Sequence, residues 1–397
     1  MEPHSVSPNT PASLRLTAGL ALVGLWSLGC ASVAGTGAAV ETREVHPAVR
    51  HIRMVREEGP WVINVLEVNL NDSSVVVGSV RAREHVRERE TTSSMARRSQ
   101  DSLWTVLGAV NADFFESDGE SVSHQIADGL IVQAVARPLV RSQFAVTRGG
   151  RCLIEEFDYS GRAIFPAGEV LPISAVNKWK RTRGLIAFNR YAMPAERVDT
   201  PAAAVREVRL RNVLTRADTL LYVPGDLSRD GEFLVLRWLA DSLNVPTVTL
   251  ADTVRVLHRF LPDRGPLSVL VGGLPRLVID GGSVADREEL REGSSGEFAT
   301  RRHPRSGVGF SRDSTMLYLV AVDGRQQASL GMTLAEFAGL MISLGIYQGL
   351  NLDGGGSTTM VVGDSVVNSP SDLTGERPVS NALLIRARRH GQEHELP

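Results

Sequence analysis

The sequence predicts a mixed α and β (α+β) fold in which mixed β-sheets dominate and helices pack on them. Short apolar runs recur from about residue 61 to residue 385, and glycine, proline, asparagine or aspartate separates them, which is typical of strands joined by turns. The 37 glycines and the aromatic content of only 5% fit a chain rich in strands and turns. One amphipathic helix between two apolar runs near the C-terminus adds a strand–helix–strand crossover.

The composition argues against one broad class of function. The 397 residues carry 43 basic and 45 acidic side chains, and a net charge of −2 does not suit a general nucleic-acid binder. No internal repeat with a period of 20–50 residues is present, which argues against a solenoid or a propeller.

The first 34 residues are predicted to be an export signal. Arg15 precedes an uncharged apolar run, residues 16–28, that is short for a membrane-spanning helix. The run ends in Ser27-Leu-Gly-Cys30, which is close to a bacterial lipoprotein box, and cleavage after Ala34 is the alternative. We therefore expect an exported protein of the cell envelope, in the periplasm or attached to the membrane through a lipidated Cys30, or a secreted protein.

Two segments follow this signal. Residues 35–48 are predicted to form a flexible tether, and residues 49–390 are predicted to form one domain. If Cys30 is lipidated or removed, Cys152 has no partner, so we expect no disulfide framework in the mature chain.

The first two-thirds of the domain is predicted to be rich in strands. Residues 61–70 and 75–80 form a predicted hairpin, residues 81–90 a solvated charged loop or helix face, and residues 91–100 a short helix. The polar segment 286–298 is predicted to be a surface insertion. Further strands are predicted at residues 103–110, 129–132, 143–146, 184–188, 205–210 and 220–223.

The strand at residues 103–110 runs into Asn111-Ala-Asp-Phe-Phe115. Polar residues at the end of a buried strand are candidate site residues. The alternative is that Asn111 and Asp113 cap the strand while the two phenylalanines pack in the core.

The amphipathic helix near the C-terminus lies between two acidic residues. Thr333 and Glu336 form a capping box at its start, and Gly345 is predicted to end it. The apolar run before the helix ends at Asp323, and the run after it ends at Asp353. Because such a crossover joins parallel strands, we expect parallel and even neighbouring strands, with both acids at one carboxyl edge of the sheet.

Asp353 also stands at the mouth of a glycine triplet, residues 354–356, and the hydroxyls of Ser357 and Thr358 come next. Three consecutive glycines indicate a sharp turn or the close approach of another group. The local pattern leaves two interpretations open: a site for a polar ligand, or a tight corner with a solvated Asp353.

A basic segment precedes the predicted strand that begins near residue 306. It contains His303 and Arg305. An arginine can hold a phosphate or a carboxylate with two parallel hydrogen bonds, and a basic surface cluster is the alternative.

With these motifs, the chain resembles the phosphodiester glycosidase family from about residue 50 to residue 388. The early element Asn111-Ala-Asp-Phe-Phe115 is similar to the family's Asn-Gly-Gly-Phe-Phe, but Ala112 and Asp113 replace glycines. Residues 150–300 match loosely. The specific motifs are His303-Pro-Arg-Ser-Gly-Val-Gly309, Val322-Asp-Gly-Arg325, Ser329-Leu-Gly-Met-Thr-Leu-Ala-Glu336, Asn351-Leu-Asp-Gly-Gly-Gly-Ser-Thr-Thr359 and Arg377-Pro-Val-Ser-Asn381.

The resemblance implies hydrolysis of a sugar that is attached through its anomeric carbon to a phosphodiester. It implies that Asp353 and Asp323 are the catalytic carboxylates, as nucleophile or as base for water. It also implies that Arg305 holds the phosphate, with Arg325 or Arg377 assisting. The residues implied to orient the sugar or the phosphate are Asn111, His303, Ser357 and Thr358, and Asp113 is expected to alter the pocket.

Two other functions stay open. The side chains of Asn111, Asp113, Asp323 and Asp353 are oxygen ligands of the kind that Ca²⁺ or Mg²⁺ accepts, which would suit a metal-dependent phosphodiesterase that cleaves the P–O bond. The second open function is that of a non-catalytic glycan-binding protein of the envelope. The glycosidase interpretation requires no cofactor, and its partner is a sugar phosphodiester or an envelope glycan such as an exopolysaccharide, not nucleic acid.

Overall fold

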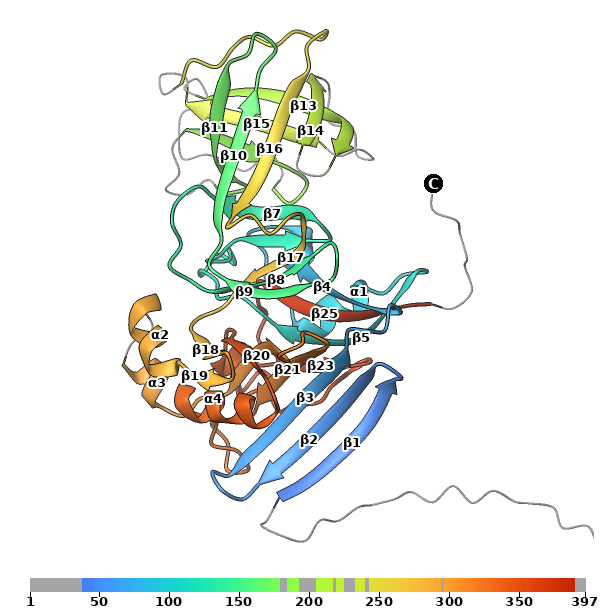
Figure 1. The fold of residues 1–397 in the computed structure, drawn as a ribbon, viewed down its shortest axis with the longest axis vertical. Coiled ribbons are helices and arrows are strands. Elements are labelled where there is room, and N and C mark those ends of the chain that lie inside the picture. The colour runs from blue at the N-terminus through green and yellow to red at the C-terminus, as the bar shows by residue number, and fades with distance from the viewer. Residues whose placement is uncertain are drawn as a thin grey trace, which may run out of the picture. The chain divides into compact units, whose positions relative to one another are not determined.

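The computed structural model describes residues 38–178, 184–192, 205–216, 219–224, 233–239, 243–293 and 296–389 (Figure 1). The predicted export signal, including Cys30, lies outside these residues. Within the described residues, no helix has the length and apolar character needed to cross a membrane.

The fold is mostly β, so the α+β prediction was wrong. Strands make up 50% of the structure and helices 11%. The prediction failed because most apolar runs pair in antiparallel sheets that cover one another or close into a barrel, and such faces do not need helices to bury them. The described α-helices are α1 (Thr92–Arg98), α2 (Ala285–Glu292), α3 (Glu297–Thr300) and α4 (Leu334–Ser343).

An eight-stranded sheet joins the first described strands to strands from the last third of the chain (Figure 1). Residues 38–46, which were predicted to be part of a flexible tether, form its first strand because they pair along their length with the second. In spatial order the strands are β1 (Ala38–His46), β2 (Val49–Arg56), β3 (Trp61–Asn69), β21 (Met316–Val322), β20 (Arg305–Phe310), β22 (Gln348–Asn351), β18 (Arg276–Ile279) and β19 (Gly282–Ser283).

A five-stranded sheet shares a core with the first sheet. Leu66 and Val308 from the first sheet belong to the same buried cluster as Val110 and Leu383 from the second. The predicted hairpin of residues 61–70 and 75–80 does not form, because β3 pairs with β2 and β21 in the first sheet and β4 pairs with β25 in the second. In spatial order its strands are β24 (Ser365–Val366), β23 (Met360–Val362), β5 (Trp104–Asn111), β25 (Asn381–Arg388) and β4 (Val75–Arg81).

The middle of the chain forms a twelve-stranded sheet, part of which closes into a seven-strand barrel. The barrel runs from β10 to β11 in the order below and closes because β10 pairs with both β11 and β16. Apolar side chains such as Leu210, Leu236 and Val256 form a buried cluster of the barrel. In spatial order the strands are β10 (Asp158–Ile164), β16 (Val254–Leu261), β14 (Thr219–Pro224), β13 (Val205–Arg216), β15 (Phe233–Leu239), β12 (Leu185–Phe188), β11 (Val170–Val176), β7 (Leu130–Val135), β6 (Gln125–Ala127), β17 (Leu267–Gly272), β8 (Gln143–Thr147) and β9 (Cys152–Glu155).

Helix α4 begins and ends as the sequence predicts. The N–H of Thr333 donates to Oε2 of Glu336 (2.9 Å), and the N–H of Glu336 donates to Oγ1 of Thr333 (3.1 Å), so the capping box is complete. Gly345 follows with a φ of 84°, a conformation that glycine adopts without strain. The helix buries Phe337 and Met341 against the eight-stranded sheet.

The crossover through α4 brings charged residues to one edge of the eight-stranded sheet. β21 and β22 run parallel, as predicted, but they are not neighbours, because β20 lies between them and pairs antiparallel with both. The start of β20 therefore lies at the same edge as the ends of β21 and β22. This edge carries Asp323, Asp353 and Arg305.

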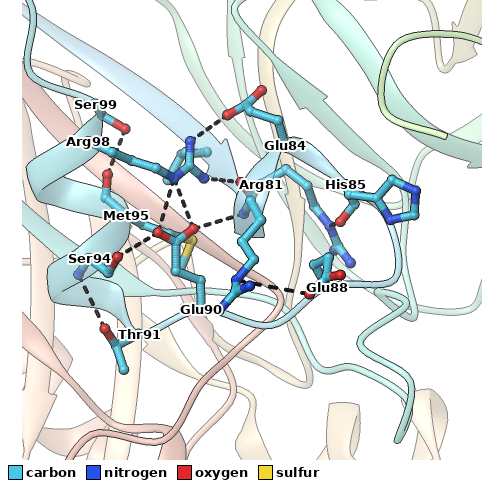
Figure 2. Close-up of polar contacts among 12 residues, drawn as sticks. Arg81, Glu84, His85, Glu88, Glu90, Thr91, Ser94, Met95, Arg98 and Ser99 are labelled. Carbon is cyan, nitrogen blue, oxygen red and sulfur yellow. Dashed lines mark hydrogen bonds and ion pairs between the residues drawn. The ribbon is translucent and has the colours of Figure 1, made fainter. Parts of the chain in front are cut away.

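The charged run at residues 81–90 is only partly solvated, because its two ends are buried. Figure 2 shows Glu90 between Ser94 and Arg98 of helix α1, from which it accepts hydrogen bonds of 2.6 and 2.9 Å. Arg81 is fully buried and donates to Oγ of Ser121 (2.6 Å). These bonds fix the segment that follows β4 against helix α1 and Ser121, whose Oγ also accepts a hydrogen bond from Nδ2 of Asn381 (3.3 Å).

Candidate active site

Asp353 lies where β22 ends and the glycine turn begins. Its N–H donates to the carbonyl oxygen of Ala112 (2.8 Å), and its own carbonyl oxygen accepts a hydrogen bond from Nδ2 of Asn111 (2.6 Å). Asn111 ends β5 in the five-stranded sheet. These two bonds join the early polar element of the sequence to the glycine triplet, although 242 residues separate Asn111 from Asp353.

Crowding explains the glycines of this turn. A Cβ on Gly354 would lie 2.7 Å from the carbonyl oxygen of Pro304, which is too close for any other residue. Gly355 has a φ of 62°, and a Cβ there would lie 3.1 Å from Nη2 of Arg325. The turn therefore admits the close approach of an arginine, which favours the ligand-site interpretation over a solvated corner.

Arg377 approaches the turn at Gly356. Its Nε and Nη2 donate to Oδ2 and Oδ1 of Asp372, at 2.8 and 3.0 Å. A Cβ on Gly356 would overlap with both partners of this ion pair. Arg377 is thereby held near Asp353, and its positive charge lowers the pKa of the Asp353 carboxyl.

The hydroxyl groups after the glycines are buried. Oγ1 of Thr358 accepts a hydrogen bond from Oγ of Ser306 (3.3 Å). Oγ of Ser357 and Oγ1 of Thr359 have no hydrogen-bond partner within the described part of the chain. Buried hydroxyls are nearly always paired, and the Asp353 carboxyl is the nearby group that the Ser357 hydroxyl influences.

Asn111 is fully engaged with the protein. Besides its bond to Asp353, its Oδ1 accepts from Oγ of Ser306 (2.7 Å) and from the N–H of Thr359 (3.1 Å). The side chain is completely buried. Its geometry therefore fits a residue that positions the turn, rather than one that touches the sugar.

Asp113 is buried close to Asp353. Its N–H donates to Oδ1 of Asn381 (2.8 Å), and its carboxylate accepts from the N–H (3.1 Å) and Oγ (3.2 Å) of Ser123. Burial raises the pKa of Asp113 to about 6, although the bonds from Ser123 and the charge of Arg141 lower it. The residue that departs from the family's glycine thus adds an ionisable group to the site.

The pKa of Asp353 is raised further, to about 7. Burial is the largest cause, and the negative charge of Asp113 adds to it, while Ser357 and Arg377 act in the opposite direction. The Ser357 hydroxyl is near enough to influence this pKa without meeting hydrogen-bond geometry. Two nearby carboxyl groups that titrate close to neutral pH are typical of acid–base sites.

Asp323 lies at the same sheet edge in a different setting. Its Oδ1 accepts from Nδ2 of Asn368 (3.1 Å) and from the N–H of Ser369 (2.9 Å), and burial raises its pKa. The charged groups with the largest effects on Asp353 are Arg377 and Asp113. Asp323 therefore anchors the loop at residues 368–369, and Asp113 is the carboxyl whose charge raises the pKa of Asp353.

Arg305 is buried without a carboxylate partner among the described residues. Its Nε donates to the carbonyl oxygen of Met332 (2.8 Å), its Nη2 donates to that of Phe298 (2.7 Å), and its guanidinium lies 5.0 Å from the centre of the Phe298 ring. Burial and the charge of Arg325 lower its pKa to about 10, so it remains a cation at neutral pH. A buried cation without a counter-ion is costly, which favours the binding of an anion nearby.

His303 and Arg325 extend this positive group toward the turn. Nη2 of Arg325 lies 3.3 Å from Nδ1 of His303. Burial and the charges of Arg305 and Arg325 lower the pKa of His303, so the imidazole is neutral at pH 7. Like Arg305, Arg325 forms no ion pair with a described residue, and it is exposed.

Several supporting residues could not be recognised in the sequence. Ser123 gave no signal, because it lies in an irregular segment and acts only through Asp113. Ser306 and Asn381 lie inside the quoted motifs, which could have drawn attention to them. Within the described ranges, no three His, Cys, Asp or Glu side chains gather as metal ligands do.

Comparison with known proteins identifies relatives of the C-terminal part. Residues 225–386 match the phosphodiester glycosidase family. A 119-residue stretch is 33% identical to the N-acetylglucosamine-1-phosphodiester alpha-N-acetylglucosaminidase of Bos taurus and covers 28% of this chain and 22% of that protein. An 84-residue stretch is 37% identical to an uncharacterized SPbeta prophage-derived protein of Bacillus subtilis and covers 21% of this chain and 13% of that protein. The chain thus spans less than a quarter of either relative.

Two solved structures share the fold. A hypothetical protein from Synechocystis aligns with a TM-score of 0.64 and 19% identity, over 88% of this chain and 64% of that chain. A putative exported protein from Burkholderia pseudomallei aligns with a TM-score of 0.59 and 21% identity, over 85% of this chain and 77% of that chain. The resemblance to the phosphodiester glycosidase family is confirmed, and the matched residues include Arg305, Asp323 and the whole glycine turn.

Proposed function

We propose, from this confirmed resemblance to phosphodiester glycosidases, that the protein is a hydrolase acting on phosphodiester-linked sugars. It cleaves the C–O bond between the anomeric carbon and the phosphate and releases the free sugar and a phosphomonoester. The observation that carries the proposal is the setting of Asp353. Its carboxyl lies near that of Asp113, and the guanidinium of Arg325, which has no ion pair with a described residue, lies close to Gly355 of the same turn.

Arg305, Arg325 and His303 supply the phosphate end of the proposed site. A phosphodiester carries one negative charge, and guanidinium groups bind phosphate oxygens with short charge-assisted hydrogen bonds. The Arg325 guanidinium lies over Gly355, so a phosphate bound to it is adjacent to the turn that presents Asp353. Arg305 is more deeply buried and adds positive potential behind this position.

Asp353 and Asp113 supply the acid–base chemistry. When the C–O bond breaks, its electron pair goes to the phosphate oxygen, and an oxygen nucleophile bonds to the anomeric carbon. Phosphate is a stable leaving group, so the step needs less proton donation than an ordinary glycosidase provides. An ionised carboxylate is needed as the nucleophile or as the base that takes a proton from water.

Burial raises the pKa of both carboxyls toward neutral pH, Asp113 to about 6 and Asp353 to about 7, and the charge of Asp113 adds to the rise at Asp353. The two groups therefore titrate as a pair. The pair therefore passes through a state with one proton, in which one carboxylate can accept a proton while the other carboxyl can donate one. The buried hydroxyl of Ser357 lies beside Asp353 and lowers the pKa of its carboxyl.

We also propose that the substrate lies outside the cytoplasm. The support is the export-signal pattern of residues 1–34, with its lipoprotein-like box at Cys30. An envelope glycan with phosphate-linked sugars, or a smaller diester, fits this location.

Product analysis tests the proposed reaction. The purified protein is incubated with a panel of glycosyl-1-phosphodiesters that differ in the sugar and in the second alcohol. Release of free sugar with a phosphomonoester is the expected result. Release of sugar 1-phosphate, abolished by a chelator, would assign the metal-dependent P–O cleavage instead, and binding without any product would assign a glycan-binding role.

A further inference from the structure

A cavity of about 500 Å³ lies where the seven-strand barrel meets β6, β7 and β17. Its walls include residues of barrel strands β11, β13, β14, β15 and β16, and none of them is a residue of the candidate active site. The mouths of β-barrels are frequent ligand sites, and small-molecule sites measure roughly 300–1,000 Å³. The cavity therefore has the position and the size of a second binding site.

The inner wall of this cavity is apolar. Leu234 and Tyr222 are buried members of the barrel core, and Leu220, Ile131 and Phe260 pack against that core while keeping part of their surface exposed. Protein interiors normally leave few voids larger than a water molecule. These side chains keep part of their apolar surface exposed. Binding of a hydrocarbon group would remove that surface from water, which is favourable.

His258 does not introduce charge into the wall. Its Nδ1 lies 2.8 Å from the hydroxyl oxygen of Tyr159. Burial lowers the pKa of His258 to about 4, so the ring is neutral at pH 7. The inner wall therefore suits an uncharged part of a ligand.

The rim of the cavity is positively charged. Arg148, Arg190 and Arg259 are exposed and line it, together with Asp128 and Asp263. Asp128 already forms an ion pair of 2.5 Å with an arginine of β25, and Oδ1 of Asp263 accepts a backbone N–H of its own turn (2.9 Å). The Arg148 guanidinium makes no hydrogen bond or ion pair with a described residue. An anionic group at the rim would meet the positive charge of Arg148, which forms no ion pair with a described residue.

We propose that this cavity binds an amphipathic anion, with a hydrocarbon chain in the apolar interior and a phosphate or carboxylate head group at the arginine rim. The neutral apolar wall selects the chain, and Arg148 selects the head group. This binding site is separate from the turn at Asp353 and does not depend on the reaction proposed for it.

Calorimetric titration of the full chain tests the proposal with three probes of equal chain length: dodecyl phosphate and dodecanoate, each below its critical micelle concentration, and uncharged dodecanol, below its solubility limit. We expect saturable binding of one molecule per chain for at least one anion, and at least tenfold weaker binding of dodecanol. The tighter anion identifies the head group. Absence of saturable binding for both anions, or equal affinity for dodecanol, overturns the proposal.

Variants locate the bound probe. Arg148→Glu should weaken anion binding about tenfold or more, which corresponds to about 1.4 kcal/mol. Arg151→Glu is the matched control, because Arg151 is an exposed arginine close in sequence that does not line the cavity. Leu220→Trp should reduce the binding of both anions by filling the cavity. Equal effects of the two arginine variants would place the probe elsewhere and refute the assignment, even if Leu220→Trp proved unstable.

Discussion

Replacing Asp113 by asparagine should shift the pH dependence of the site to lower pH. The negative charge of Asp113 is one of the causes that raise the pKa of Asp353 to about 7. The amide of asparagine removes this charge and keeps a side chain of nearly the same size. Ionisation of Asp353 then becomes easier, so its pKa must fall.

The size of the shift follows from the charge that is removed. A charge next to a carboxyl typically shifts its pKa by about 1–3 units, which corresponds to about 1.4–4 kcal/mol in the free energy of ionisation. Asp353 is only half-buried, and Asp113 is itself protonated at low pH, so solvent and titration reduce the effect. We therefore expect the pKa of Asp353 to fall by about one unit.

The pH profile of kcat/KM on a glycosyl-1-phosphodiester measures this shift. If Asp353 donates a proton, the alkaline limb moves to lower pH in Asp113→Asn, and if Asp353 acts ionised, the acid limb moves in the same direction. Carbon-13 NMR of labelled aspartate carboxyls gives the same pKa without relying on turnover. Asp364→Asn, on the exposed turn after β23, is the control that removes a similar charge at a distance.

An unchanged profile would refute this reasoning. If the limb near pH 7 stays in place in Asp113→Asn, Asp113 does not interact with Asp353. If Asp364→Asn produces the same shift, the effect reflects the general charge of the protein and not the carboxyl pair.

Three further predictions concern the groups around this pair. Gly355→Ala and Gly363→Ala both place a Cβ at positive φ and should each destabilise the fold by about 1–2 kcal/mol in thermal unfolding. Only Gly355→Ala should also impair turnover, because only its Cβ approaches Arg325. Arg305→Gln should raise KM for the phosphodiester and weaken inhibition by inorganic phosphate, and an unchanged KM would exclude a phosphate role. Asp323→Asn should retain kcat within about tenfold, since its amide oxygen can still accept from Ser369, whereas a loss as large as that of Asp353→Asn would make Asp323 catalytic.

The C-terminal third was the most predictable part of the fold. The capping box at Thr333, the glycine stop at Gly345 and the parallel direction of the flanking strands are local signals, and the structure contains all three. The insertion of β20 between those strands could not be predicted, because strand order depends on pairing between segments far apart in the sequence. For the same reason the barrel was missed: its strands are short, and closure depends on β10 finding both β11 and β16.

The sequence predicted which residues form the candidate site better than it predicted how they are arranged. The sequence placed Asp353, Arg305 and Asn111 in one site. The structure brings Asp353 and Arg305 to one edge of the eight-stranded sheet, and Asn111 bonds to Asp353 from the five-stranded sheet. Asp323 follows β21, two strands from β22 in the sheet order, whereas Asp113, which follows β5 of the other sheet, acts on Asp353 through its charge, and neither relation has a local signal in the sequence. Burial, which sets both pKa values, is a property of the packed sheets and leaves no local pattern in the sequence.

The most direct test of the central claim compares Asp353→Asn with the native protein on a glycosyl-1-phosphodiester that the native protein hydrolyses. Released free sugar is measured at pH 7, with Asp364→Asn as the control and thermal unfolding as the check on folding. We predict that Asp353→Asn lowers kcat by about 10²–10⁴-fold while the substrate still binds, and that the control keeps native activity. A folded Asp353→Asn variant that releases sugar at the native rate would contradict the account.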